Sequence, residues 1–191
     1  MYEIIRIGVT MTIHSKSVES KKLNWTLRCP TVKDAAELSE LRVKIDGETQ
    51  NLDREPGEGY LSPKEFEDLI KDDNEAEKNL FLVAEIDGRI GGFTRCVGNK
   101  LSRFKHKAEF GICILNEYQG YGIGRILLEH IINWADEIGI QKINLTVLET
   151  NEKAIRLYEK FGFVKEGLLL HDRIHKDGRY YNTVIMGRFH G

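Results

Sequence analysis

Three closely spaced glycines, Gly120, Gly122 and Gly124, lie in the part of the chain best suited to chemistry. A β-branched and aromatic run at residues 109–115 precedes them and predicts a strand. Residues 125–138 follow and repeat apolar side chains at helical spacing. Glycine lets a backbone approach a ligand closely, and the first N–H groups of a helix remain free to donate hydrogen bonds. The segment therefore predicts a loop that binds phosphate or another anion.

The residues that follow the loop separate the common phosphate-binding motifs. A P-loop ends in Gly-Lys-Ser/Thr, but here Gly124 is followed by Arg125 and Ile126, which disfavours a nucleotide kinase or an ATPase. A dinucleotide fingerprint needs another glycine where Arg125 stands. Two interpretations remain, an anion loop of the form Gln-x-x-Gly-x-Gly and a glycine-rich turn that caps a helix without a ligand.

A second segment, NEKAIRLYEKFGF at residues 151–163, predicts a short capped helix. Asn151 is a good N-cap, Gly162 supplies the helix stop, and Tyr158 falls on the apolar side. Periodicity alone is compatible with a core aromatic at Tyr158. Taken together and in this order, the two segments resemble the pyrophosphate loop and the second signature of the GNAT superfamily of N-acetyltransferases.

The resemblance implies a function and a set of roles. The protein would bind acetyl-CoA as a cosubstrate and transfer its acetyl group to a primary amine by direct attack in a ternary complex. Tyr158 would protonate the departing CoA thiolate, since a phenol with a pKa of about 10 is protonated near neutral pH. Glu109, at the start of the strand before the loop, would be the general base. A strand N–H would polarise the thioester carbonyl.

The resemblance also implies which residues contact the cofactor. The strand candidates are Ile112, Cys113 and Ile114, and Asn151 would bind the cofactor or its water as well as cap a helix. The loop candidates are Gln119, Gly120, Tyr121, Gly122, Ile123, Gly124 and Arg125.

Several of these positions have a second interpretation. Glu109 is also explained as a surface charge at a strand end, and Arg125 as a solvated arginine rather than a phosphate ligand. The family loop often begins with Arg and is often preceded by Pro, whereas this chain has Gln119 and Asn116. The loss of that positive charge would weaken pyrophosphate binding modestly.

Metal and nucleophile chemistry find little support. His171 and His175 are four residues apart, but they fall in a predicted strand and turn, and no Glu stands where a zinc protease needs one. No Ser or Cys lies in a nucleophile-elbow sequence. We therefore expect no metal site and no hydrolase triad.

The elements that must position these residues follow the order βααβββαβαββ from about residue 24. A capping box at Ser62 with Pro63 and Glu65 starts the second helix, and Asp87-Gly88 joins two strands of a meander. The fold class is thus α/β (α+β), a GNAT-like acyl-CoA N-acyltransferase fold with a mixed central sheet of about seven strands flanked by about four helices. Residues 1–22 are interpreted as an N-terminal appendage or tail, and residues 23–191 as one domain.

Composition limits the partners. With 191 residues, 41% hydrophobic and 30% charged, the chain predicts one soluble domain, and a net charge of −2 disfavours nucleic acid as a bulk electrostatic partner. The three cysteines form no C-x-x-C pair and suggest a reducing cytoplasm. No apolar run reaches the length of a membrane span.

The acceptor and the oligomeric state are left open by the sequence. An acidic loop at residues 46–58 suits a cationic small amine or a basic peptide equally well. Two alternatives to a small-molecule enzyme therefore stand, a non-catalytic acyl-CoA-binding regulatory domain and an acetyltransferase for protein N-terminal or lysine amines. The resemblance also suggests a homodimer.

Overall fold

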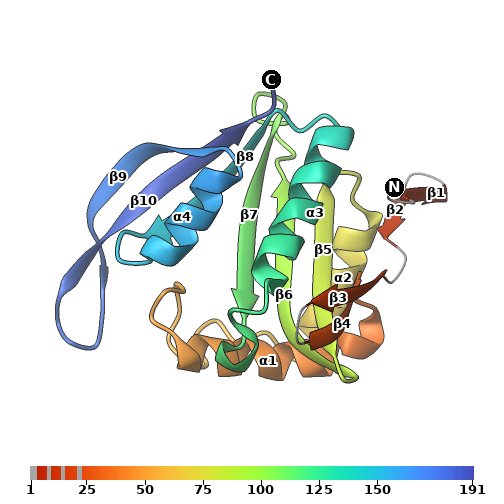
Figure 1. Cartoon of the computed structure of the whole chain (residues 1–191), viewed down its shortest axis with the longest axis horizontal. Helices are drawn as coiled ribbons and strands as arrows, with labels where there is room; N and C mark the ends of the chain where they lie inside the picture. The colour runs from red at the N-terminus through yellow and green to blue at the C-terminus, as the bar shows by residue number, and fades with distance from the viewer. Residues whose placement is uncertain (1–3, 8–9, 14–15, 21–22) are drawn as a thin grey trace.

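A mixed sheet carries four helices in the computed structural model, which describes residues 4–7, 10–13, 16–20 and 23–191 (Figure 1). The strands are β1 (Ile4–Ile7), β2 (Thr10–Ile13), β3 (Lys16–Ser20), β4 (Leu23–Arg28), β5 (Asn79–Ile86), β6 (Arg89–Gly98), β7 (Lys107–Ile114), β8 (Lys142–Leu148), β9 (Phe163–Ile174) and β10 (Tyr180–Phe189). The helices are α1 (Ala35–Glu48), α2 (Pro63–Glu75), α3 (Ile123–Glu137) and α4 (Glu152–Lys160), with 3-10 turns η1 (Val32–Asp34) and η2 (Asn116–Tyr118). The predicted α/β (α+β) class, with a mixed sheet and four helices, is confirmed.

The sheet has eight strands in the order β3-β4-β5-β6-β7-β8-β10-β9, one more than the approximate number predicted. The additional strand, β3, comes from the segment interpreted as a tail and pairs antiparallel with β4. Its sequence, KSVES, has a single apolar residue and thus no alternating pattern. An edge strand is held by backbone hydrogen bonds along one side, so it can form without that pattern. The division of the chain at residue 22 stays a prediction.

The predicted helix cap at Ser62 and the predicted hairpin turn at Asp87-Gly88 are both confirmed. Ser62 and Glu65 form the predicted capping box, in which the Ser62 N–H donates to Glu65 Oε2 at 2.7 Å and the Glu65 N–H donates to Ser62 Oγ at 3.3 Å. Asp87 and Gly88 both have positive φ, 49° and 77°, as a two-residue type I′ hairpin turn requires.

Two apolar cores lie on opposite faces of the sheet. One packs α3 and α4 against side chains such as Phe110 and Leu145, and the other packs α1 and α2 against Phe81 and Leu115. Figure 1 shows α3 and α4 in front of the strands. Because successive strand residues face opposite sides, each β7 side chain is directed to one of these two layers. No helix in the described part of the chain is long and apolar enough to cross a membrane.

Candidate active site

Strands β7 and β8 run parallel but pair only at their beginnings. Their ladder joins residues 107–109 to residues 142–144. Beyond it, β7 continues to Ile114 beside β6, while β8 continues to Leu148 beside β10. Figure 1 shows β8 and β10 turned away from β7 beyond the paired segment. The sheet therefore contains, near its middle, a stretch of β7 whose backbone groups on one side are not used by a neighbouring strand.

The register with β6 identifies those backbone groups. The Leu115 N–H donates to Gly91 O at 3.0 Å, and hydrogen-bonded positions alternate along an antiparallel pair. Cys113, two residues earlier, therefore directs its backbone groups toward β6, and Ile112 and Ile114 direct theirs toward the opening. Of the three strand residues expected at the cofactor, only Ile112 and Ile114 are oriented to donate an N–H there.

The glycine loop lies at the end of β7. Gly120 and Gly122 have φ of 87° and 86°, in the region that favours glycine, and Gly122 is the N-cap of α3. A Cβ on Gly124 would lie 3.2 Å from Ile114 Cδ1, so the loop packs closely on the strand. The first hydrogen bond of α3 runs from the Ile126 N–H to Gly122 O.

The N-terminus of α3 has the properties of an anion site. It has no capping side chain and no acidic residue in its first turn, so the N–H groups of residues 123–125 have no acceptor within the helix. Gln119 donates its side-chain amide to Ile114 O at 3.3 Å and to Asn116 Oδ1 at 2.9 Å, which ties the loop to β7. Tyr121 and Arg125 are exposed beside the loop.

Tyr158 is positioned by α4 beside the point where the ladder ends. The Asn151 side chain accepts from the Ala154 N–H at 3.3 Å and so starts this helix, as predicted. The Tyr158 ring lies 6.1 Å from the ring of Phe110, in an edge-to-face arrangement, and is 8% exposed. Burial raises the pKa of Tyr158 to about 12. The phenol therefore holds its proton throughout the neutral range.

Glu109 lies on the opposite face of β7 from Tyr158. Phe110 packs in the α3/α4 core, so its neighbour Glu109 faces the α1/α2 side, as does Cys113. Glu109 is exposed and is the last β7 residue paired with β8, opposite Asn144. Glu109, the expected base, and Tyr158, the expected acid, therefore lie on opposite sides of the sheet, at the place where β7 and β8 separate. We call the face with Glu109 the acceptor face.

Cys113 is a partly buried cysteine on the acceptor face. Burial, with the charge of Asp46, raises the pKa of Cys113 to about 12. A thiol with that pKa carries almost no thiolate near neutral pH, and the thiolate is the nucleophilic form. The cysteine nearest the opening is therefore poorly suited to form an acetyl-enzyme.

Three polar residues of the acceptor face were not identified from the sequence. Asn144 Oδ1, Thr183 Oγ1 and Arg173 Nη1 are buried and have no hydrogen-bond partner within the described residues. Asn144 and Thr183 lie in strands that contain other polar residues, so their types alone did not distinguish them. Their position on this face follows from pairing registers, which the sequence does not reveal. Buried polar atoms without partners are uncommon, and they are typical of sites that receive a ligand or water.

The acidic loop is held by the β9–β10 hairpin rather than left free. Arg173 Nη2 lies 2.5 Å from Asp53 Oδ1, and Lys176 Nζ lies 2.6 Å from Glu55 Oε2. Asp46 is likewise paired, with Arg54 Nε at 3.1 Å. Because these carboxylates already have cationic partners, the loop attracts a cationic acceptor less than its composition suggests.

An irregularity in β10 directs the hairpin toward that loop. The register with β9 shifts between Tyr181 and Thr183, and His171 has a positive φ of 51° at this bulge. Asn182 Oδ1 accepts from the His171 N–H at 3.0 Å. Bulges bend a strand and increase its twist, so this one sets the direction of the hairpin tip.

The histidines have structural contacts. His171 stacks on Tyr180 at 5.1 Å between ring centroids, and His175 stacks on Tyr181 at 4.2 Å. His175 Nδ1 also lies 3.1 Å from Gln50 Oε1. Within the described residues, no group of three or more His, Cys, Asp or Glu side chains is arranged to hold a metal ion.

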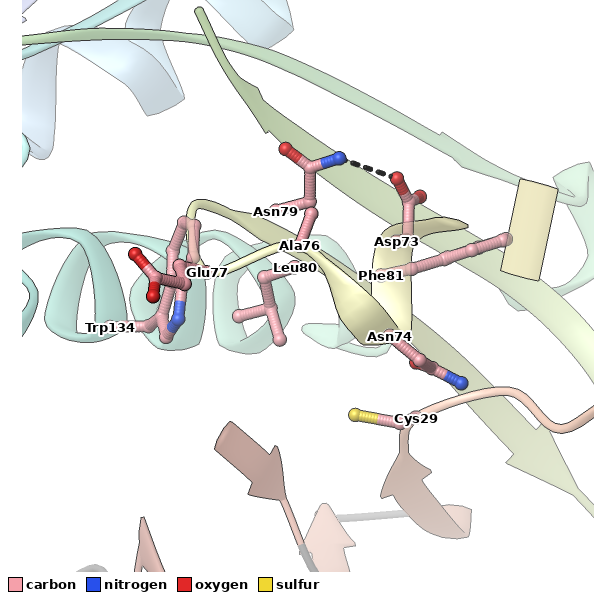
Figure 2. A pocket seen from close by; sticks show the side chains of 9 residues that line it. All are labelled: Cys29, Asp73, Asn74, Ala76, Glu77, Asn79, Leu80, Phe81 and Trp134. Atoms are coloured by element: carbon pink, nitrogen blue, oxygen red, sulfur yellow. Dashed lines mark hydrogen bonds between the residues drawn. The ribbon is translucent and has the colours of Figure 1, made fainter. Parts of the chain in front are cut away.

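A separate hollow lies away from the opening. Figure 2 shows its lining, which includes Cys29, Asp73, Asn79 and Trp134. Trp134 is near the end of α3, roughly 18 Å along the helix from Gly122. Asp73 is buried and already accepts hydrogen bonds from Asn79 and Arg95. We attribute this hollow to packing between α2, β5 and α3 and assign it no role in the chemistry.

Comparisons with known proteins agree with this geometry. A model of the acetyltransferase (GNAT) family matches residues 48–163. The chain is 32% identical over 108 residues to the L-amino acid N-acetyltransferase AaaT of Escherichia coli K12, covering 56% of this chain and 66% of that protein. It is 32% identical over 133 residues to the spermidine N(1)-acetyltransferase of the same organism, covering 69% of this chain and 68% of that protein.

A solved structure extends the similarity over most of the fold. The structure of an acetyltransferase of the GNAT family from Streptococcus pneumoniae superposes with a TM-score of 0.84 at 29% identity. It covers 87% of this chain and 99% of the other. The alignments to the two Escherichia coli enzymes span about two thirds of the length of those enzymes.

Proposed function

Because the chain belongs to the GNAT family of acetyl-CoA-dependent N-acetyltransferases, we propose that it acetylates a small primary amine by direct attack in a ternary complex. The opening between β7 and β8 is the observation that carries the proposal. It connects the α3 N-terminus and Tyr158 on one face with Glu109 on the other. A thioester placed in the opening would be reached by an amine from the acceptor face alone.

The site residues have complementary roles in this reaction. The N–H groups of residues 123–125 would bind the pyrophosphate of acetyl-CoA, and the N–H of Ile112 or Ile114 would bind the carbonyl oxygen as it gains negative charge. Gln119 and Asn151 would hold the loop and α4 in place around the cofactor. Tyr121 and Arg125 would lie at its outer surface.

The bond changes then follow. Glu109, directly or through water, takes a proton from the ammonium group, and the free amine attacks the acetyl carbon. The tetrahedral intermediate collapses with cleavage of the carbon–sulfur bond. Tyr158 gives its proton to the departing thiolate, the attacking nitrogen releases its surplus proton to solvent, and Tyr158 regains a proton from solvent. The high pKa of Cys113 supports direct transfer over an acetyl-cysteine intermediate.

The size of the acceptor is inferred from the loop and the hairpin. Arg173–Asp53 and Lys176–Glu55 join them along one side of the acceptor face. An extended peptide would have to cross these contacts, whereas a small amine would not. This supports a small-molecule acceptor over a protein acceptor.

We further propose a homodimer formed through β9 and a cytoplasmic location. Strand β9 is at the edge of the sheet, and five of its large apolar side chains are exposed, namely Val164, Leu168, Leu169, Leu170 and Ile174. Long apolar edge strands favour association with another chain. The three cysteines are free thiols, as suits a reducing compartment. The absence of nucleic-acid and membrane partners stays a prediction.

Calorimetric titration with acetyl-CoA tests the proposed function, with ATP and NAD as controls. We expect saturable binding of acetyl-CoA alone, followed by amine-dependent release of free CoA. A protein that is folded but does not bind acetyl-CoA would contradict the proposal.

A further inference from the structure

We propose that the acceptor carries a carboxylate, as an amino acid does, and that Arg42 binds this carboxylate with Arg54 beside it. The inference rests on the proposed function and specifies the substrate class of the same site. Its basis is a pair of guanidinium groups, those of Arg42 and Arg173, whose hydrogen-bonding capacity is not filled within the described residues.

The position of Arg42 follows from its contacts. It lies on α1, and its Nη1 donates to Gly59 O at 2.7 Å. A Cβ built on Gly59 would lie 3.6 Å from Arg42 Nη2 and 3.8 Å from Arg54 Cδ, so the two arginine side chains meet at this glycine. Both charges, and that of Asp46, act on the Cys113 sulfur. Cys113 stands between Ile112 and Ile114, so both guanidinium charges are within electrostatic range of the segment of β7 that faces the opening.

Arg42 lacks a carboxylate partner within ion-pair distance among the described residues. Asp46 is paired with Arg54, through Nε at 3.1 Å and Nη2 at 3.3 Å, and Arg42 donates to the neutral carbonyl of Gly59. Burial and the neighbouring charge of Arg54 lower the pKa of Arg42 from its ordinary value. An anion bound here would offset both effects, because an opposite charge stabilises the cation.

A second observation points to the same kind of ligand. Arg173 directs Nη2 to Asp53, but its buried Nη1 has no hydrogen-bond partner in the described part of the chain. Asp53 is the neighbour of Arg54, so this donor belongs to the same loop and hairpin. The acceptor face therefore has guanidinium donors that remain available to a ligand. These donors suit a carboxylate, which spermidine does not carry.

A panel of acceptors tests the inference after acetyl-CoA binding has been measured. Single L-amino acids, their C-terminal amides and spermidine are compared by release of free CoA. An amide keeps the amine and the side chain but removes the negative charge. We expect the best amino acid to exceed its amide by about 10- to 100-fold in kcat/KM, the range expected for a hydrogen-bonded charge.

Variants then assign the effect to Arg42. Arg42→Gln should raise KM for the best amino acid about tenfold with little change in kcat, and it should leave kcat/KM for the amide unchanged. Arg42→Lys should retain part of the preference because it keeps the charge. Lys44→Gln is the matched control, since it removes an exposed cation from the same helix.

The outcomes separate this inference from the proposed function. If acetyl-CoA does not bind, the proposed function itself is wrong. If acetyl-CoA binds and spermidine or the amides are acetylated as well as or better than every amino acid, the function stands and the proposed acceptor carboxylate is wrong. An equal loss for amino acid and amide in Arg42→Gln would show a structural role for Arg42 and would also overturn the inference.

Discussion

Tyr158 combines two properties that a thiolate-protonating acid needs. It is packed against Phe110 at the point where the sheet opens, and burial raises its pKa to about 12. The proton is therefore present at every pH at which the enzyme would work. The sequence motif predicted the role of Tyr158. Its contact with Phe110 could not be predicted, because periodicity alone indicates only that Tyr158 lies in the core.

We predict that Tyr158→Phe lowers kcat by about 100-fold, the lower end of the usual effect of a general acid. The affinity for acetyl-CoA should change little, because the ring and its packing remain. Single-turnover release of CoA and calorimetric titration measure the two quantities. Tyr180→Phe, at an exposed tyrosine of β10, serves as the control. Wild-type turnover in Tyr158→Phe across the pH range would exclude Tyr158 as the acid.

At the scale of the element, the loop and α3 form one unit. The left-handed conformation of Gly122 ends the loop and begins the helix, so the direction of the free N–H groups depends on it. A Cβ there meets no atom within 4 Å, and any cost of substitution therefore comes from the backbone conformation.

Gly122→Ala should lower the free energy of unfolding by about 1–2 kcal/mol and Tm by roughly 4 °C. The dissociation constant for acetyl-CoA should rise about tenfold, because the N–H groups would be turned from their direction. Thermal unfolding and calorimetry provide the readouts. Gly167→Ala, at a glycine of β9 without positive φ, should affect neither quantity. Undiminished cofactor affinity in Gly122→Ala would argue against the loop as the pyrophosphate site.

Helices, strands and turns were predictable where residues close in the sequence determine them. They were less predictable where they depend on contacts between residues far apart in the sequence. The Ser62 capping box, the Asp87-Gly88 turn and the glycine loop are written in four or five consecutive residues. Strand β9 extends to Ile174, and its pairing with β10 continues past the register shift between Tyr181 and Thr183, which no local pattern indicates. The contact of Gln50 with His175 joins positions 125 residues apart, and no local pattern could indicate it.

At the scale of the whole molecule, the sheet has two unequal edges. The edge at β3 is short, and the edge at β9 is long and apolar. The two sides of the candidate site also differ in how far the sequence predicts them. The cofactor side follows from two sequence motifs, whereas the acceptor side is assembled from α1, its loop and the hairpin, whose relative positions depend on the complete fold.

We predict a dimer that Leu170→Asp converts to monomer, because a charge would be buried at the centre of the apolar edge. Leu170 is 72% exposed in the single chain, so the substitution should not disturb folding. Size-exclusion chromatography with light scattering gives the mass of each form. Leu101→Asp, at a leucine 65% exposed in the loop before β7, is the matched control. A monomeric wild-type protein at micromolar concentration would count against the interface.

Because β7 and β8 separate, a strand in the middle of this sheet has unpaired backbone N–H groups, as an edge strand does. The amides of Ile112 and Ile114 face the opening, while that of Cys113 faces β6. In the free protein, we expect the first two to exchange with deuterium far faster than Cys113, although all three lie in one strand. Acetyl-CoA should slow that exchange selectively, so an alternation along three consecutive amides would report occupancy of the site without any turnover.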